Sequence, residues 1–166
     1  MAAHNLLSKC DRALAAYLIA EGAGTSADVY PAKRSLDKVL PDTLCHCDSA
    51  SELAPYSGTY LVRASINVRS QAAILADDDA DDPDQPREDA DTRVAATFDA
   101  FHKFAENSSG DQLGAAITAA AAAAGVTGLT IQDVEVKGLA AGFEEKGSTW
   151  IDTLTLELIA CPNDGV

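Results

Sequence analysis

The stretch "YSGTYLVRASINVRS" at residues 56–70 decides the fold class, because it carries the clearest strand pattern in the chain. From Tyr60 to Val68 apolar side chains occupy every second position, and mostly polar side chains such as Arg63 and Asn67 stand between them. A period of two is typical of a β-strand with one buried face and one solvated face. The sequence therefore predicts a half-buried strand here, with Ser57-Gly58 as the turn before it.

A second strand is predicted over residues 43–48, in the stretch "TLCHCDSA" (43–50), and it forms a hairpin with the first. The triplet of Cys45, His46 and Cys47 looks like a metal site. Side chains alternate along a strand, however, so His46 points away from both cysteines. Cys-x-Cys is also a weak zinc signal, because tetrahedral sites usually take Cys-x₂₋₄-Cys and a second pair. We predict that Cys45 and Cys47 hold no metal, form no disulfide and pack on a half-buried strand.

Periodicity and turn signals place the other elements around this hairpin. Between Pro31 and Pro41 we expect a loop with a short strand or turn. Elsewhere we expect helices over 5–21, 88–106 and 110–125, and strands over 129–138 and 148–162 separated by an exposed loop. The apolar phase slips in the first of these strands, which predicts a bulge near Gln132–Asp133. This order predicts one α+β domain over residues 1–166, with an antiparallel sheet and helices packed on one face.

Acidic residues dominate the composition. The 166 residues include 26 Asp or Glu against 12 Lys or Arg, and the formal net charge is −14. This balance argues against tight binding to a phosphate backbone, which needs clusters of Lys and Arg. Nine of the acids lie in "ADDDADDPDQPREDAD" (76–91), which we expect to be a solvated, mobile loop insertion without a calcium site. Its first six acids are Asp77, Asp78, Asp79, Asp81, Asp82 and Asp84.

No motif for catalysis stands out in the sequence. A phosphate-binding glycine loop, G-x-S-x-G and H-E-x-x-H are all missing, and the three histidines are scattered. We therefore expect no enzyme activity and no cofactor. No secretory signal or membrane span is predicted either, and four cysteines in a chain of this length favour reduced thiols in a cytoplasmic protein.

The order and character of the segments resemble a known family. The resemblance is carried by "LCHCDSASEL", "YSGTYLVRASINVRSQA", an acidic break, "FDAFHKF", an alanine-rich helix and the closing "WIDTLTLELIACPND", over roughly residues 5–164. This pattern is similar to the tail-completion proteins of tailed bacteriophages, also called tail terminators or head–tail joining proteins. The acidic insertion and the alanine run are features of this chain's own.

The resemblance implies a structural virion protein rather than an enzyme. Such a protein closes the end of the tail tube as a homo-oligomeric ring, usually a hexamer, and joins the tail to the connector protein of the head or neck. DNA passes through the hole without specific binding. The implied partners are further copies of the chain, the tail tube protein and the connector, with no membrane and no cofactor. The implied location is the tail or neck of the virion, assembled in the host cytoplasm.

Within such a ring, we expect polar strand faces to supply subunit contacts through Arg63, Asn67, Arg69 and Glu157. The acids of 76–91 and Glu144–Glu145 are the candidates for a channel or surface wall. Three alternatives stay open. The first is a neck-ring or tail-tube subunit, which a long stacking β-hairpin arm would favour and for which we expect only residues 138–149 to serve. The second is a metal-binding or hydrolytic domain that uses Cys45, Cys47 and Cys161. The third is a host-side adaptor whose acidic run binds basic partners.

Overall fold

The strand predicted from residue 60 onward is present as β3 (Tyr60–Gln71), near the centre of the sheet. The structure is a computed structural model that describes residues 5–31, 40–71, 85–103, 110–144 and 149–163. The side chains of Val62, Ala64 and Ile66 are at most 1% exposed, whereas Arg63 between them is exposed. The predicted alternation of a buried and a solvated face is therefore confirmed.

Among the described residues, five strands form one sheet in the order β1-β2-β3-β5-β4. β2 (Asp42–Glu52) pairs antiparallel with β3, and so does β5 (Thr149–Pro162) from the other side. β4 (Leu129–Glu144) lies outside β5 as an edge strand. The other edge is β1 (Val29–Pro31), which runs parallel to β2. The sheet is therefore antiparallel, as predicted, except for the parallel pairing of the three-residue β1.

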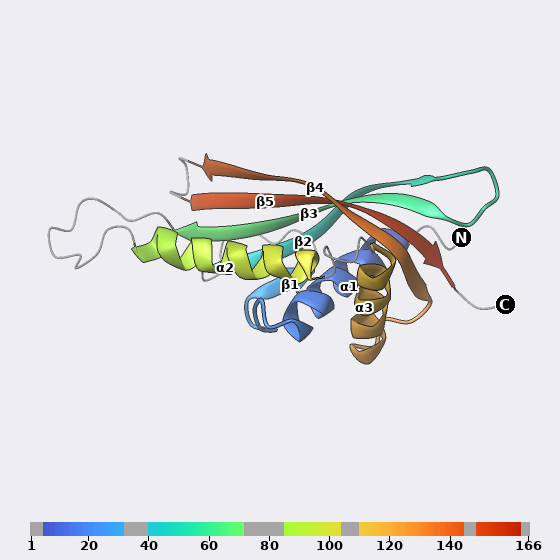
Figure 1. Cartoon of the computed structure of the whole chain (residues 1–166), viewed down its shortest axis with the longest axis horizontal. Coiled ribbons are helices and arrows are strands. Elements are labelled where there is room, and N and C mark those ends of the chain that lie inside the picture. The colour runs from blue at the N-terminus through green and yellow to red at the C-terminus, as the bar shows by residue number, and fades with distance from the viewer. Residues whose placement is uncertain (1–4, 32–39, 72–84, 104–109, 145–148, 164–166) are drawn as a thin grey trace, which may run out of the picture.

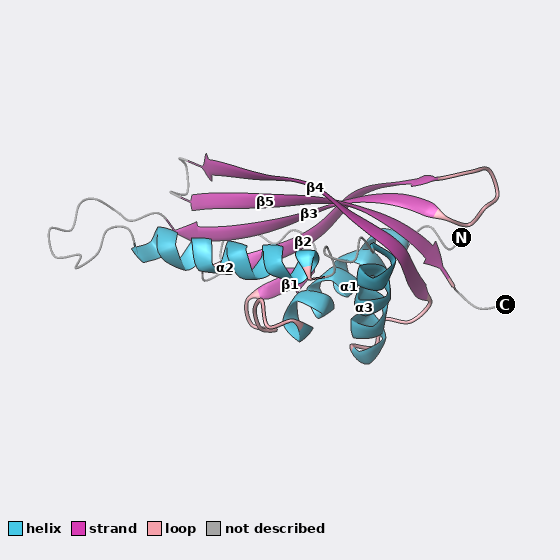
Figure 2. Cartoon of the chain, viewed as in Figure 1, coloured by secondary structure: helices cyan, strands magenta, loops and turns pink. Residues whose placement is uncertain are grey.

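The three helices in the described part of the chain cover one face of the sheet, as the sequence predicts (Figures 1 and 2). α1 (Leu6–Ala20) and α3 (Gly110–Ala123) lie side by side, and α2 (Gln85–His102) lies under the half of the sheet where the β4–β5 hairpin turns. The core between the layers contains Leu14, Tyr17 and Leu18 of α1, all at most 1% exposed. The chain therefore has the α+β architecture expected from its element order.

An arginine fixes α2 against the β1 edge of the sheet. Arg93 donates hydrogen bonds to Asp28 Oδ2 at 2.7 Å and to Thr43 Oγ1 at 3.3 Å. Burial alone would raise the pKa of Asp28, but the hydrogen bonds from Arg93 and Thr25 outweigh it and lower that pKa. Thr43 and Asp28 lie 50 and 65 residues from Arg93 in the sequence, so local periodicity does not predict this contact.

α3 approaches β4 closely at the predicted bulge. The register of β4 against β5 shifts between Ile131 and Asp133. Thr118 of α3 accepts a hydrogen bond from the Ile131 N–H at 2.9 Å. A Cβ atom added at Gly114 would lie 2.6 Å from the Ile131 carbonyl oxygen, so only glycine allows this approach. The bulge prediction is confirmed, and α3 supplies a partner for its backbone.

The exposed loop predicted over 139–148 is wrong for its first six residues. They continue β4 and pair with β5, from Leu139 opposite Leu154 to Glu144 opposite Thr149. The rings of Phe143 and Trp150 pack with centroids 4.8 Å apart near the turn of this hairpin. Glycines that look like loop signals are tolerated here because β4 is an edge strand.

The β2–β3 hairpin extends beyond the helical layer as an arm (Figure 1). Residues 48–58 are all exposed. Leu53 is 51% exposed, and Tyr56, at the turn with a left-handed φ of 61°, is fully exposed. We call residues 48–58 the hairpin arm. β2 therefore continues to Glu52, past residue 48 where the predicted strand ends.

Candidate subunit interface

The face of the sheet opposite the helices carries a row of ion pairs across three strands. We call it the open face. Arg63 on β3 lies opposite Glu157 on β5, with Nε and Oε1 3.4 Å apart. Lys137 on β4 reaches the other oxygen of Glu157 at 3.1 Å and Glu135 at 2.6 Å. The Arg63 side chain is 66% exposed, so this row is accessible to another molecule.

The ion pairs set the charge states on the open face. The hydrogen bond from Lys137 is the main cause that lowers the pKa of Glu157, and Arg63 adds to it. The hydrogen bonds to Glu135 and Glu157 raise the pKa of Lys137. Lys137 and Glu157 are therefore both ionised near neutral pH. Exposed pairs of this kind stabilise a fold little, because water screens them, so they are available for exchange with charges on a partner.

Asn67 and Arg69 follow Arg63 on the same side of β3, but only Asn67 is part of the open face. Its Oδ1 accepts a hydrogen bond from Thr153 at 2.8 Å, and the side chain is half-buried. Arg69 is 8% exposed and its guanidinium binds the fully buried Asp42 through two hydrogen bonds of 2.8 and 2.5 Å. Because Arg69 is held within its own chain, it is removed from the set expected to contact a neighbouring subunit.

Only part of the acidic wall predicted from residues 76–91 and Glu144–Glu145 lies within the described residues. Asp77, Asp78, Asp79, Asp81, Asp82 and Asp84 lie outside the described residues, and so does Glu145. The last seven residues of 76–91 belong to α2, so the predicted loop is shorter than expected at that end. Glu144 is exposed at the end of β4. Its charge contributes to the raised pKa of Arg69, after the Asp42 hydrogen bond.

The cysteines of β2 lie as the alternation predicts. Cys45 and Cys47 are buried toward the helices, whereas His46 lies on the other side, 3.2 Å from Asp48. The hydrogen bond to the Cys10 thiol and burial raise the pKa of Cys47, and burial raises that of Cys45. The described part of the chain has no group of three or more His, Cys, Asp or Glu that could hold a metal ion. The absence of a metal at Cys45 and Cys47 stays a prediction.

A buried carboxylate beside these cysteines is missing from the sequence prediction. Asp11 of α1 is 6% exposed, and its Oδ1 accepts a hydrogen bond from the Cys47 N–H at 2.6 Å. Burial is the main cause that raises the pKa of Asp11. The signal was present in the helical spacing, because position 11 follows Leu7 by four residues and precedes Leu14 by three, so it lies on the buried stripe.

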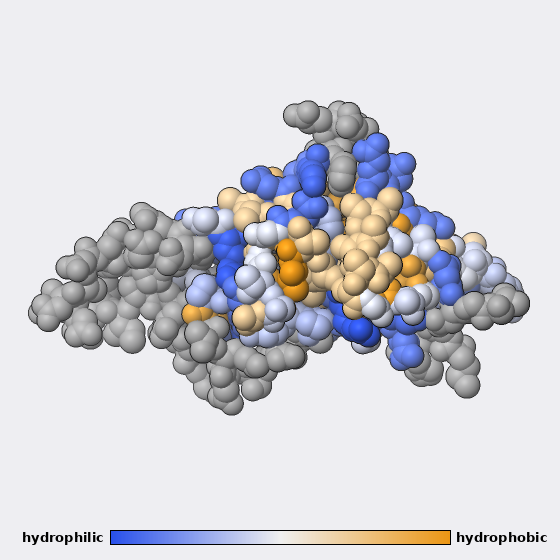
Figure 3. Space-filling model, turned by 90° about the horizontal axis from the view of Figure 1, so that it is seen from below, coloured by the Kyte–Doolittle hydropathy of each residue, from blue (hydrophilic) through white to orange (hydrophobic). Residues whose placement is uncertain are grey.

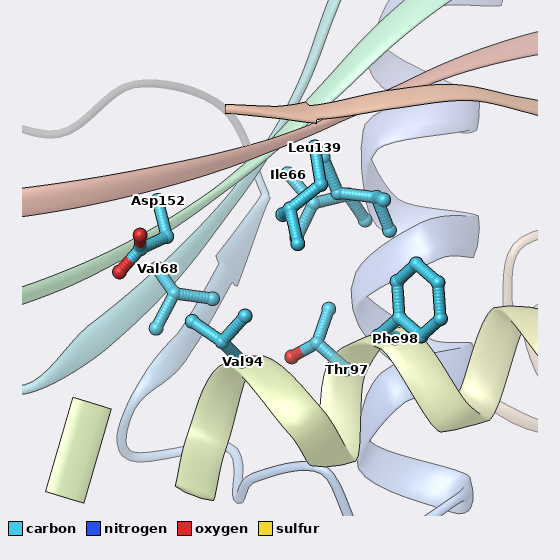
Figure 4. A pocket seen from close by; sticks show the side chains of 8 residues that line it. Ile66, Val68, Val94, Thr97, Phe98, Leu139 and Asp152 are labelled. Carbon is cyan, nitrogen blue, oxygen red and sulfur yellow. The ribbon is translucent and has the colours of Figure 1, made fainter. Parts of the chain in front are cut away.

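A small cavity lies between α2 and the sheet (Figure 4). Its volume is about 10 Å³, and its lining includes Thr97, Phe98, Leu139 and Asp152. The Thr97 hydroxyl is buried and makes no hydrogen bond to the described residues. The space fits about one water molecule, whereas small-molecule sites usually need hundreds of cubic ångströms. We therefore do not treat this cavity as a substrate site.

The helix-bearing side shows an apolar region over α1 and α3 (Figure 3). Exposed alanines repeat on one face of α3, at Ala115, Ala119, Ala122 and Ala123. Ile19 of α1 is 36% exposed near them. No helix among the described residues has both the length and the hydrophobicity to cross a membrane.

No protein-family model matches this chain, and no curated protein matches it. The resemblance to tail-completion proteins thus rests on the sequence segments alone.

Proposed function

We propose that this chain is a structural subunit of a phage tail, which closes the end of the tail tube as a ring and joins it to the head or neck connector. The proposal starts from the family resemblance of the sequence. The hairpin arm is the structural observation that best supports it. An extended two-stranded arm with Leu53 and Tyr56 exposed leaves apolar surface in water unless another molecule covers it.

A ring gives the arm a natural position on the next subunit. Contacts between different surfaces of neighbouring copies close into a ring when the rotation between them allows it. The open face, with Arg63 and Lys137 opposite Glu157, offers charged groups that can exchange partners across such a contact. Shape and charge thus support self-association without any bound cofactor.

The charge distribution supports passage of DNA without tight binding. The net charge is −14, and Arg63 and Lys137 on the open face both bind Glu157 of the same chain. A cation that already has an acidic partner contributes less to phosphate binding, which depends on released counterions. DNA moving past such a surface would meet few strong contacts.

A tail-tube subunit of related fold is the second candidate. The length of the hairpin arm favours it, because an arm of this kind can reach the ring above or below. The sequence prediction assigned that task only to residues 138–149, of which 138–144 instead continue β4 and pair with β5. The two candidates differ in outcome: a terminator forms one closed ring, whereas a tube subunit stacks into tubes.

Electron microscopy of the purified chain, alone and in assembled particles, tests the proposal. We expect closed rings with a central hole that do not stack into tubes, and mass measurements that rise to one defined oligomer with concentration. Arg63→Glu should weaken ring assembly, and the loss should be smaller at high salt because salt screens the new repulsion from Glu157. Arg12→Glu, on the exposed side of α1, is the matched control and should leave rings intact. Stacked tubes would favour the second candidate, and a chain without rings in both settings would refute both.

A further inference from the structure

The outer edge of β4 is unpaired over residues 138–144 among the described strands. Residues 138–144 are exposed along their whole length, and no described strand pairs with their outer edge. Natural sheet edges are usually shielded by short length, proline or charges. The β1 edge follows this rule with three residues that end in Pro31, whereas "GLAAGFE" (138–144) has no proline and one charge at its end. The β4 edge is therefore open to a partner strand.

We propose that this edge pairs antiparallel with the same edge of a second copy, about a two-fold axis at Ala141. In this register Leu139 lies opposite the partner's Phe143, and Ala140 lies opposite the partner's Gly142. The axis repeats both pairs. The two five-stranded sheets then form one continuous sheet.

The register follows from the pleat and from the order of large and small residues. Residues that meet across a strand pair must lie on the same face, so the axis has to pass through a residue. Leu139 and Phe143 lie on the helix side of β4, 52% and 47% exposed. An axis at Ala141 places these two large side chains opposite each other. A shift of the axis to Ala140 would place Phe143 against the partner's Lys137, and a shift to Gly142 would leave Leu139 beyond the partner's Glu144.

Charge complementarity supports the same choice of a second copy as the partner. Glu144 lies on the open face at one end of the segment, and Lys137 lies on the same face at the other end, beside the second register shift of β4. The antiparallel arrangement brings Lys137 close to the partner's Glu144, once at each end of the contact. Between these charges the open face has only Gly138, Ala140 and Gly142, which allow close approach. An unrelated strand would match neither the charges nor the large side chains.

This pairing goes beyond the proposed ring. A two-fold contact closes with two copies, whereas a ring needs a contact between two different surfaces. The hairpin arm and the Arg63–Glu157 pair of the open face remain free for that second contact, and where both contacts form, the two-fold pairs join one ring to another. The dimer and the ring can therefore fail separately.

A cysteine at the axis gives the most direct test. In a Cys161→Ser background of the full chain, Ala141→Cys should form a disulfide-linked dimer under mild copper-catalysed oxidation, because only a residue on the axis meets itself. The other native cysteines, Cys10, Cys45 and Cys47, are buried and do not compete. Ala122→Cys, an exposed alanine of α3, is the control and should cross-link at least tenfold more slowly. Equal rates for the two variants would overturn the proposal.

Sedimentation measures the same contact without a cross-link. We expect the wild-type chain to form dimers, and Leu139→Lys or Phe143→Lys to raise the dimer dissociation constant at least tenfold. Ala122→Lys, at an exposed alanine of α3 outside both proposed contacts, should leave the dimer unchanged. A monomeric wild-type chain, or a Leu139→Lys dimer as tight as the wild type, would refute the pairing. Rings that persist in Leu139→Lys would leave the proposed function standing, and an Ala141→Cys cross-link in a chain that forms no rings would refute that function alone.

Discussion

At the scale of single residues, the two arginines of β3 show how similar positions acquire different roles. Removal of Arg69 leaves the fully buried Asp42 without a partner, so Arg69→Ala should destabilise the fold by about 3–5 kcal/mol. Arg63 is two-thirds exposed, and Arg63→Ala should change stability by about 1 kcal/mol or less. Urea unfolding of both variants measures the difference. Similar small losses would mean that Asp42 is hydrated.

The same contrast decides how assembly experiments are designed. An Arg69→Glu exchange places two carboxylates together in a buried site, and we expect it to prevent folding rather than to weaken a subunit contact. Arg63→Glu changes an exposed side chain and is the informative variant. Burial thus separates the two residues, although the alternation of β3 gives both the same face.

Asp11 gives a prediction with a pH signature. Its pKa in the folded chain is raised above the ordinary value of 3.8, chiefly by burial, so the folded state holds its proton more tightly than the unfolded state. The wild type therefore loses stability as the pH rises from about 3.8 through the raised pKa. Asp11→Asn does not titrate and still offers an oxygen to the Cys47 N–H. The melting temperature of Asp11→Asn minus that of the wild type should therefore increase as the pH rises through the raised pKa of Asp11, and should be constant at higher pH.

Thermal melts from pH 3 to 8 on both proteins would measure this difference. A constant offset at all pH values would contradict the assignment to Asp11. Asp11→Ala is the control, because it also removes the acceptor and leaves the Cys47 N–H without its partner. We expect Asp11→Ala to be less stable than Asp11→Asn by about 1–3 kcal/mol.

At the scale of elements, the contact of α3 with the β4 bulge depends on one hydroxyl. Thr118→Val keeps the shape of the side chain but leaves the Ile131 N–H without an acceptor, at a cost of about 1–3 kcal/mol. Thr118→Ser keeps the hydroxyl and should lose less. Denaturant unfolding measures both. A Ser variant as unstable as the Val variant would assign the effect to packing of the methyl group instead.

Elements with strong periodicity were predictable from sequence, and those with mixed signals were not. The pattern of Val62, Ala64 and Ile66 identifies β3, and the phase slip at Gln132–Asp133 locates the bulge. Residues 139–144 were missed because glycines and small residues resemble a loop. Their strand is fixed by pairing with β5 and by the contact of Phe143 with Trp150, and neither is visible in local sequence.

At the scale of the whole molecule, the order of elements predicts the α+β class and the position of the helices on one face. It does not predict the parallel pairing of β1, because three residues carry too little pattern. The candidate interface was predictable only in part. Alternation places Arg63, Asn67 and Arg69 on one face, but the register that brings Asp42 opposite Arg69 decides which of them stays accessible.

The position of β5 affects how the chain is made. β5 follows the other four strands in chain order, yet it lies between β3 and β4 in the sheet. A ribosome delivers β4 before the strand it pairs with, and β3 remains open on one side until residues 149–162 emerge. Pairing between β3 and β5, which lie far apart in the sequence, is slow. The nascent chain therefore exposes the apolar faces of β3 and β4 until β5 has emerged. Translation of β5 therefore completes the sheet from its middle rather than extending it at an edge.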